Sequence, residues 1–173
     1  MPNNNKTSQG SNQIWKFGDA INTDDILPGK YAPLMVGEEN YHKYTFAHLR
    51  PEFAETVQPG DVLVGGWNWG LGSSREYAPS ALKKLGVAGI IAKSFARIHF
   101  RNLINLGIPA IAGPEIVDFF LDHDPISFDP INGHVTVANT DYRLPPLGAF
   151  AEEILKAGSL MEHFRQHNRF PGE

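Results

Sequence analysis

The sequence predicts an α/β domain in which helices flank a mixed sheet. Between residues 62 and 122, short apolar runs alternate with helix-like segments, a pattern typical of parallel strands joined by right-handed crossovers. After residue 125, Asn132 and Gly133 separate two strand-like runs, which indicates an antiparallel hairpin. The 173 residues are 42% hydrophobic and 11% aromatic, which is enough for a sizeable core. We expect one domain over residues 14–173.

Composition and charge exclude several classes of protein. The formal net charge of −4 shows no basic excess, which argues against non-specific binding of nucleic acids. No run approaches the ~18 apolar residues of a transmembrane helix. The chain has no cysteine, so it can form no disulfide and cannot ligate zinc or an iron–sulfur cluster through thiolates. Residues 1–13 lack the apolar stretch of a secretory signal, so we expect a disordered polar tail and a cytoplasmic protein.

The N-terminal third is expected to contain one strand and little other regular structure. Residues 14–17 alternate, which indicates a short strand. Residues 18–33 are interrupted by prolines and glycines, so they are expected to be mostly loop. Residues 38–57 are polar and aromatic, and one or two short helices there should break at Arg50 and Pro51.

The helix after the first buried strand has two interpretations. In one, it covers residues 79–85, with Pro79 at its first position and Gly86 beyond its end. In the other, Ser73 and Glu76 form a capping box, and an earlier helix kinks at Pro79. The remaining elements expected up to residue 122 are a turn over 58–61, strands over 62–66, 87–92 and 108–111, a helix over 95–106 capped by Ser94 and ended by Gly107, and a helix over 115–122.

The C-terminal part is expected to supplement this core with antiparallel strands and two closing helices. The strands that flank the hairpin turn and the third strand beside them are expected over 126–128, 134–138 and 141–144. The closing helices are expected over 150–157 and 160–167, separated by Gly158.

The segment from Gly65 to Glu76 carries the strongest functional signal. Its four glycines allow positive φ angles and close approach of the backbone to a ligand, at the open end of a strand where α/β sheets bind ligands. Backbone N–H groups in such a turn form an anion site, and the fork of Arg75 favours a two-oxygen anion. The segment matches neither a Walker loop nor a Gly-x-Ser-x-Gly elbow. It therefore predicts a site for a small carboxylate.

Other polar clusters have simpler explanations. Residues 22–25 resemble an Asx turn, and no third ligand accompanies the two aspartates to complete a metal site. Lys30 follows a Pro-Gly pair and would ordinarily be a solvated loop lysine. His99 lies four residues after Phe95, and Arg101 four residues after Arg97, which suggests a mixed interface face on the expected helix.

Three motifs in order resemble the small subunits of 3-isopropylmalate dehydratase, which are equivalent to the swivelling domain of aconitase. The motifs are residues 18–31 (GDAINTDDILPGKY), residues 70–79 (GLGSSREYAP) and residues 94–99 (SFARIH). The resemblance is clear over residues 15–113 and weaker beyond. It implies an aconitase-type swivelling β/β/α domain over residues 14–173.

The resemblance also implies a function. In that family, a [4Fe–4S] cluster acts as a Lewis acid on a hydroxy acid, and three cysteines of the large subunit hold the cluster. A chain without cysteine fits this division of labour. The implied protein is the small subunit of a heteromeric hydro-lyase, inactive without its cysteine-bearing large subunit and binding no metal itself. The implied reaction interconverts 2-isopropylmalate and 3-isopropylmalate in leucine biosynthesis, and the assembly is a heterodimer or heterotetramer.

The resemblance assigns roles to individual residues. Ser73 matches the serine that removes the proton α to a carboxylate, and surrounding donors must stabilise its alkoxide-like form. Arg75 would hold a substrate carboxylate, assisted by Ser74 and Gly72, with Lys30 near a further carboxylate. Asp24 matches a polar residue that supports these contacts. The loop that reads the substrate side chain matches Tyr31, Ala32, Pro33 and Leu34.

The chain departs from the family pattern at several positions. It has Leu71 where many small subunits have cysteine, Tyr77 where they have histidine, and Ala-Pro at residues 32–33. Residues 31–34 contain no arginine for a long acidic substrate, which favours isopropylmalate or a methylated malate. A pocket distinguishes one methylene by only ~1–3 kcal/mol. The alternatives are therefore homoaconitase, a methylmalate or dimethylmalate dehydratase and, in another class, a non-catalytic anion-binding module.

Overall fold

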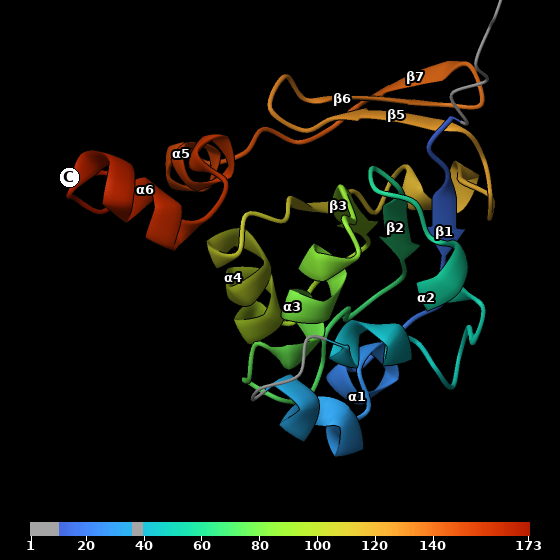
Figure 1. Ribbon diagram of the computed structural model, residues 1–173. Coiled ribbons are helices and arrows are strands. Elements are labelled where there is room, and N and C mark those ends of the chain that lie inside the picture. The colour runs from blue at the N-terminus through green and yellow to red at the C-terminus, as the bar shows by residue number, and fades with distance from the viewer. Residues whose placement is uncertain (1–10, 36–39) are drawn as a thin grey trace, which may run out of the picture.

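A parallel sheet of four short strands lies at the centre of the computed structural model, which describes residues 11–35 and 40–173 (Figure 1). The strands are β1 (Ile14–Lys16), β2 (Val62–Gly65), β3 (Gly89–Ala92) and β4 (Ala110–Ala112), and their order in the sheet is β1-β2-β3-β4. All three pairings are parallel, as the alternating pattern predicts. Because both faces of this sheet are covered, its strands are apolar on both sides.

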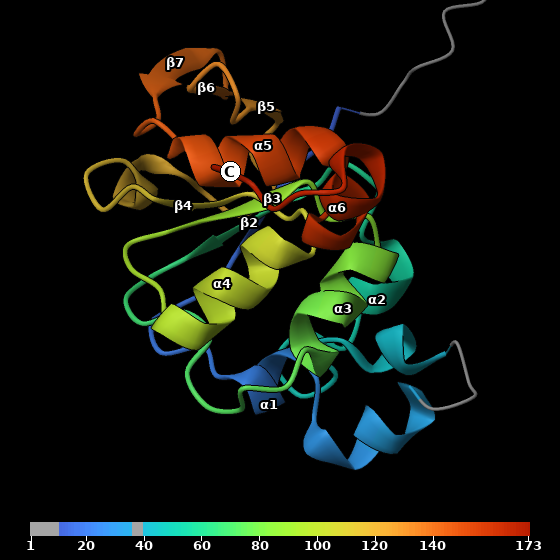
Figure 2. The ribbon, with the colours of Figure 1, turned by 90° about the vertical axis from the view of Figure 1, so that its left-hand side faces the viewer.

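Two helices cover one face of the parallel sheet. Figure 2 shows α3 (Tyr77–Lys84) and α4 (Arg97–Asn105) side by side in front of it. Leu63 and Ile90 point into the core beneath these helices. Val64 and Ile91 belong to the core on the opposite face.

The starts of both helices differ from the sequence prediction. Helix α3 begins at Tyr77, so Pro79 occupies its third position, where a backbone N–H has no partner within the helix. The alternative capping box is also absent, because the Oγ of Ser73 accepts hydrogen bonds from Arg75 instead. The expected cap at Ser94 is wrong, because its Oγ accepts a hydrogen bond from the N–H of Asn68. Helix α4 therefore begins only after Ala96.

The second face of the parallel sheet packs against a separate antiparallel sheet. Its strands are β5 (Ile126–Asp129), β6 (His134–Val137) and β7 (Thr140–Arg143), paired in that order. The fold class is confirmed, but the two kinds of strand form two sheets rather than one mixed sheet. The hairpin loop takes residues 130–133, and the carboxylate of Asp129 accepts from the N–H and Nδ2 of Asn132.

The expected helix over residues 115–122 is wrong, and a single 3₁₀ turn, η3 (Val117–Phe119), takes its place. The Nζ of Lys16 donates to the carbonyls of Val117 and Phe120 at 3.3 and 2.5 Å. The N–H of Leu121 donates to Asp124 at 2.8 Å. These bonds use backbone groups that a continuing helix would need.

The region expected to be mostly loop contains regular turns. Asn22 and Asp25 form a reciprocal capping box that begins α1 (Thr23–Ile26). A 3₁₀ helix, η1 (Gly29–Met35), follows it directly. The short helices expected after residue 38 are confirmed among the described residues as η2 (Tyr41–Tyr44) and α2 (Phe53–Thr56).

The two closing helices are confirmed as α5 (Ala149–Ala157) and α6 (Leu160–His167). Gly158 between them has a φ of +96°, which ends α5 in a left-handed turn. The Nζ of Lys83 donates to the carbonyls of Leu106 and Gly158, so it ties the end of α4 to this turn. None of the helices in the described residues is long and apolar enough to span a membrane.

The N-terminal segment joins the fold just before β1. Residues 1–10 of the expected tail lie outside the described residues. The Nδ2 of Asn12 donates to the carbonyl of Pro59, and the N–H of Gln13 donates to the carboxylate of Asp61. The buried carboxylate of Asp61 also accepts a hydrogen bond from the Nε1 of Trp15. This one side chain therefore holds the start of β1 in place.

Candidate active site

The site lies at the carboxyl edge of the parallel sheet, where the turn after β2 meets α1. The N–H of Gly70 donates to the carbonyl of Ile21 at 2.6 Å, and the N–H of Thr23 donates to the carbonyl of Leu71 at 2.7 Å. Asn22 and Leu71 thus form an isolated parallel bridge. The main chain therefore joins two motifs that lie about fifty residues apart in the sequence.

Two glycines make this contact possible. Gly70 has a φ of +86°, and a Cβ there would lie 2.3 Å from the ring of His99. Gly72 has a φ of +116°, and a Cβ there would lie 2.7 Å from the Oγ1 of Thr23. That oxygen accepts the N–H of Ser73 at 2.9 Å. The glycines let the turn fold against α1 and place Ser73 at its end.

Ser73 and Arg75 form the chemical centre of the turn. The Oγ of Ser73 accepts two hydrogen bonds from Arg75, one from the backbone N–H and one from Nε, both 3.2 Å long. The guanidinium lies over the ring of Tyr77, 5.3 Å from its centroid. Among the described residues, no carboxylate pairs with this guanidinium. Donors aimed at the hydroxyl oxygen favour its negatively charged form, and the Nη groups of Arg75 are left for an anion.

A small cavity joins this centre to α1 and η1. Ser73, Arg75, Asp24 and Gly29 all border it. The Oδ1 of Asp24 accepts the N–H of Gly29 at 3.0 Å, so this carboxylate fixes the first residue of η1. The structure therefore brings three of the sequence-predicted residues together around one cavity: Ser73, Arg75 and Asp24. Asp24 also holds the backbone of Gly29 in place.

Ser74 lies beside the centre but outside this cavity. Its side chain is exposed, and its carbonyl accepts the Nδ2 of Asn102 at 3.0 Å. The bond connects the turn to α4.

The expected substrate-reading loop forms the body of η1. Lys30 is exposed, and its Nζ lies 4.9 Å from the centroid of the Tyr31 ring. Tyr31 stacks on Tyr44 with ring centroids 3.8 Å apart and an interplanar angle of 4°. Ala32 is only 5% exposed and belongs to the core, so its side chain faces inward. Pro33 is exposed, whereas Leu34 packs against the core.

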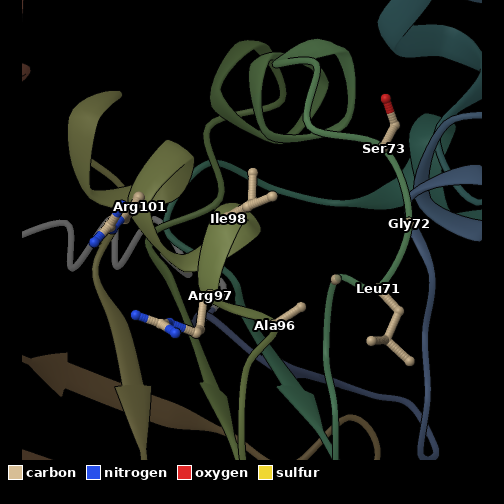
Figure 3. Close-up of a pocket in the computed structure, with 8 residues that line it drawn as sticks. Leu71, Gly72, Ser73, Ala96, Arg97, Ile98 and Arg101 are labelled. Atoms are coloured by element: carbon tan, nitrogen blue, oxygen red, sulfur yellow. The ribbon is translucent and has the colours of Figure 1, made fainter.

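A larger pocket of about 530 Å³ opens on the other side of the turn. Figure 3 shows Arg97, Ile98 and Arg101 of α4 along this pocket, opposite Leu71 and Gly72. The hydroxyl of Ser73 points away from the two arginines. The four-residue spacing of the arginines was the sequence signal for this feature. Nothing local in the sequence indicates that Thr23 contacts Ser73, because that contact depends on the fold.

His99 lies beneath the turn, and its expected place on an interface face is wrong. Its side chain is 1% exposed, and its ring packs against Gly70. Its Nε2 has no hydrogen-bond partner in the described part of the chain. Burial lowers the pKa of His99 from 6.5 to about 4, so the imidazole is neutral at pH 7.

The donor set of this chain does not fit an iron–sulfur cluster. The sequence has no cysteine, and the described residues contain no group of three or more His, Asp or Glu side chains suited to a metal ion. Asp25 is engaged in the capping box of α1, and Asp24 holds Gly29. A cluster that takes part at this site would have to come from another chain.

Comparison with known proteins identifies relatives of this chain. Residues 19–115 match the family described as the aconitase C-terminal domain, a range that begins just before α1 and ends just after β4. The chain is 58% identical over 161 residues to 3-isopropylmalate dehydratase small subunit 1 of Deinococcus radiodurans, covering 93% of this chain and 90% of that protein. It is 60% identical over 161 residues to the homoaconitase small subunit of Thermus thermophilus, covering 93% of this chain and 99% of that one.

A solved structure extends the comparison to the fold. The crystal structure of 3-isopropylmalate dehydratase from Methanocaldococcus jannaschii superposes with a TM-score of 0.83 at 34% identity, covering 91% of this chain and 94% of that chain. The matched range includes the turn with Ser73 and Arg75, the α1 segment joined to it and the start of α4. With this site geometry, these matches show that the chain belongs to the aconitase C-terminal domain family.

Proposed function

We propose that this chain is the small subunit of a heteromeric hydro-lyase that removes and re-adds water on a 2-hydroxy dicarboxylic or tricarboxylic acid. The leading substrate is 2-isopropylmalate, which the enzyme would convert to 3-isopropylmalate in leucine biosynthesis. The observation that carries the proposal is the pair of hydrogen bonds from Arg75 to the Oγ of Ser73. This pair combines a candidate base with an arginine whose Nη groups have no hydrogen-bond partner among the described residues and could bind a carboxylate.

Ser73 is the proposed base. In its alkoxide-like form, the Oγ would take the proton from the carbon α to the substrate carboxylate and become a hydroxyl. A free serine is a poor base, so the charged form needs donors in place before the reaction. The backbone N–H and Nε of Arg75 supply two of them.

Arg75 is the proposed carboxylate clamp. Its Nε faces Ser73, so its Nη groups are left to bind two carboxylate oxygens. Ser74 and the backbone of Gly72 would assist, and Lys30 would bind a further carboxylate. Asp24 would hold the start of η1 in place. Residues 31–34 of η1 would then contact the substrate side chain or support the residues that do.

The metal chemistry is assigned to the partner. A [4Fe–4S] cluster on a cysteine-bearing large subunit would supply a Lewis acid for the substrate hydroxyl. This chain contributes the base and the carboxylate ligands to the opposite wall of the site. We therefore propose a cytoplasmic heterodimer or heterotetramer in which the small subunit alone is inactive.

Homoaconitase is the second candidate. The 60% identical Thermus thermophilus relative carries that name, and its identity to this chain is close to that of the 3-isopropylmalate dehydratase relative. Against it, residues 31–34 contain no arginine for the second acidic end of a longer substrate. This absence favours an apolar substrate tail, as in isopropylmalate or a methylated malate.

One experiment tests the proposal. The chain is co-expressed with a cysteine-bearing large subunit of the same enzyme family, and the complex is reconstituted anaerobically with iron and sulfide. Turnover is then compared on 2-isopropylmalate, citramalate and homocitrate, with each subunit alone as the control. We expect the highest kcat/KM on 2-isopropylmalate and none from either subunit alone. If no large subunit binds and phosphate protects the isolated chain from unfolding, the protein is an anion-binding module instead.

A further inference from the structure

Two arginines near the site have no partner within the described chain. Arg97 and Arg101 lie one helical turn apart on α4, and both are exposed. Within residues 11–35 and 40–173, neither guanidinium forms an ion pair or a side-chain hydrogen bond. Both border the 530 Å³ pocket beside the Gly70–Ser73 turn (Figure 3). On a chain with a formal charge of −4, this is a local concentration of unpaired positive charge.

Apolar side chains surround these two arginines. Ile98 is 53% exposed, Leu71 41% and Phe100 37%. A second pocket of about 370 Å³ lies next to the first and is lined by Phe95, Phe100 and the same two arginines. We call Leu71, Arg97, Ile98, Phe100 and Arg101 the arginine surface. Arginine and aromatic side chains are enriched where proteins bind proteins, and the centre of such a surface is more apolar than its rim.

The arginine surface is separate from the proposed carboxylate clamp. Ser73 borders both cavities, but its hydroxyl points away from Arg97 and Arg101 (Figure 3). Arg75, which donates to that hydroxyl, borders the small cavity on the α1 side and is not among the residues that line the 530 Å³ pocket. A substrate carboxylate held by Arg75 at Ser73 therefore does not use the cations of α4.

We propose that the arginine surface is the docking site for acidic side chains of the large subunit. This inference rests on the proposed function, which requires such a partner. Arg97 and Arg101 would each bind a carboxylate of the large subunit through two N–H groups. Ile98 and Leu71 would contact apolar side chains of the large subunit beside these carboxylates. Charge complementarity favours acidic side chains as the occupant, because carboxylates would neutralise the two guanidinium groups. The surface also adjoins the exposed Ser73 turn that the partner must cover to complete the site.

Charge reversal tests the inference. Arg97→Glu, Arg101→Glu and the double variant are compared with Arg165→Glu, which reverses an exposed arginine on α6. The Kd for the purified large subunit is measured at several salt concentrations, with thermal unfolding as the folding control. We expect each variant at α4 to weaken assembly about 30-fold or more, because removing one member of a desolvated charge pair costs at least about 2 kcal/mol. Arg165→Glu should bind like the wild type.

The outcomes separate this inference from the proposed function. If the wild-type chain does not bind the large subunit, both fail. If the wild type binds and all the reversal variants assemble with unchanged Kd, the docking site is elsewhere and only this inference fails. Unchanged assembly with a raised KM for substrate would assign the arginines to substrate binding instead. Restored affinity on changing a partner Asp or Glu to Lys would support the inference even if a reversal variant were less stable.

Discussion

Arg75 donates to the Oγ of Ser73 from two different atoms, its backbone N–H and its Nε, at the same distance of 3.2 Å. The proposed base and the proposed carboxylate clamp are therefore linked before any substrate arrives. A carboxylate on the Nη groups would lie beside the oxygen that takes the proton. The geometry thus ties substrate position to base position through a single side chain.

Ser73→Ala is expected to reduce kcat by about 10²–10⁴-fold in the assembled enzyme, the usual contribution of a general base. The Kd for the large subunit should not change, because the serine hydroxyl faces Arg75 and the small cavity. Steady-state kinetics and a binding titration measure the two quantities. The neighbouring Ser74→Ala variant should act mainly on KM. Near-normal turnover in Ser73→Ala would assign proton removal to another group.

Arg75→Lys keeps the positive charge but removes the fork. A lysine ammonium cannot donate to Ser73 and bind two carboxylate oxygens in the same arrangement. We expect kcat/KM to fall by at least tenfold, because a hydrogen bond to a charged group contributes about 1.5–3 kcal/mol. Initial rates over a range of substrate concentrations give kcat and KM separately. Wild-type values for both would contradict the clamp.

Gly70→Ala is expected to destabilise the fold by about 2 kcal/mol or more. The added Cβ would lie 2.3 Å from the ring of His99, and the φ of +86° is itself unfavourable for alanine. Gly148→Ala is the matched control, because a Cβ at Gly148 meets no atom within 4 Å and its φ is −68°. Urea denaturation of both variants measures the difference. Equal stability would mean that the turn does not need a glycine at residue 70.

The stability of the chain should fall as the pH decreases from about 6.5 toward 4. The pKa of His99 is about 4 in the folded state and near 6.5 when the chain is unfolded, so the unfolded chain binds the extra proton in this range. The free energy of unfolding therefore decreases on acidification, by at most about 3 kcal/mol from this group.

His99→Phe, which does not titrate, should lose this part of the pH dependence, as measured by urea denaturation at several pH values. His48→Gln, at an exposed position, should keep it. The same slope in wild type and His99→Phe would assign the pH dependence to other groups.

Local sequence signals predicted the elements with strong patterns. The buried apolar runs predicted β2 and β3, and Gly158 marked the boundary between the closing helices. The glycine turn and its arginine predict a carboxylate site from residue types alone, and this stays a prediction. The sequence missed what depends on distant partners. Ser94 bonds to Asn68 instead of capping α4, and Lys16 binds carbonyls that the expected helix over residues 115–122 would have used.

The position of His99 shows the same limit. Periodicity placed it beside Arg101 on a helix, but only the fold shows that Gly70 lies against its ring. Likewise, the sequence did not indicate that the carboxylate of Asp24 accepts the N–H of Gly29, and the supporting role that the resemblance implies for Asp24 stays a prediction.

The joint between α1 and the Gly70–Ser73 turn consists of the main-chain atoms of Ile21, Thr23, Gly70 and Leu71. Ile21 and Leu71 contribute only carbonyl groups, which every residue type supplies, so the joint does not depend on their side chains, whereas the close packing at residue 70 requires glycine. The residues after Gly29, which follow α1 in the chain, take no part in these hydrogen bonds. We therefore expect changes at residues 30–34 to alter which substrate side chain is accepted while the hydrogen bonds that hold the Ser73 turn remain in place.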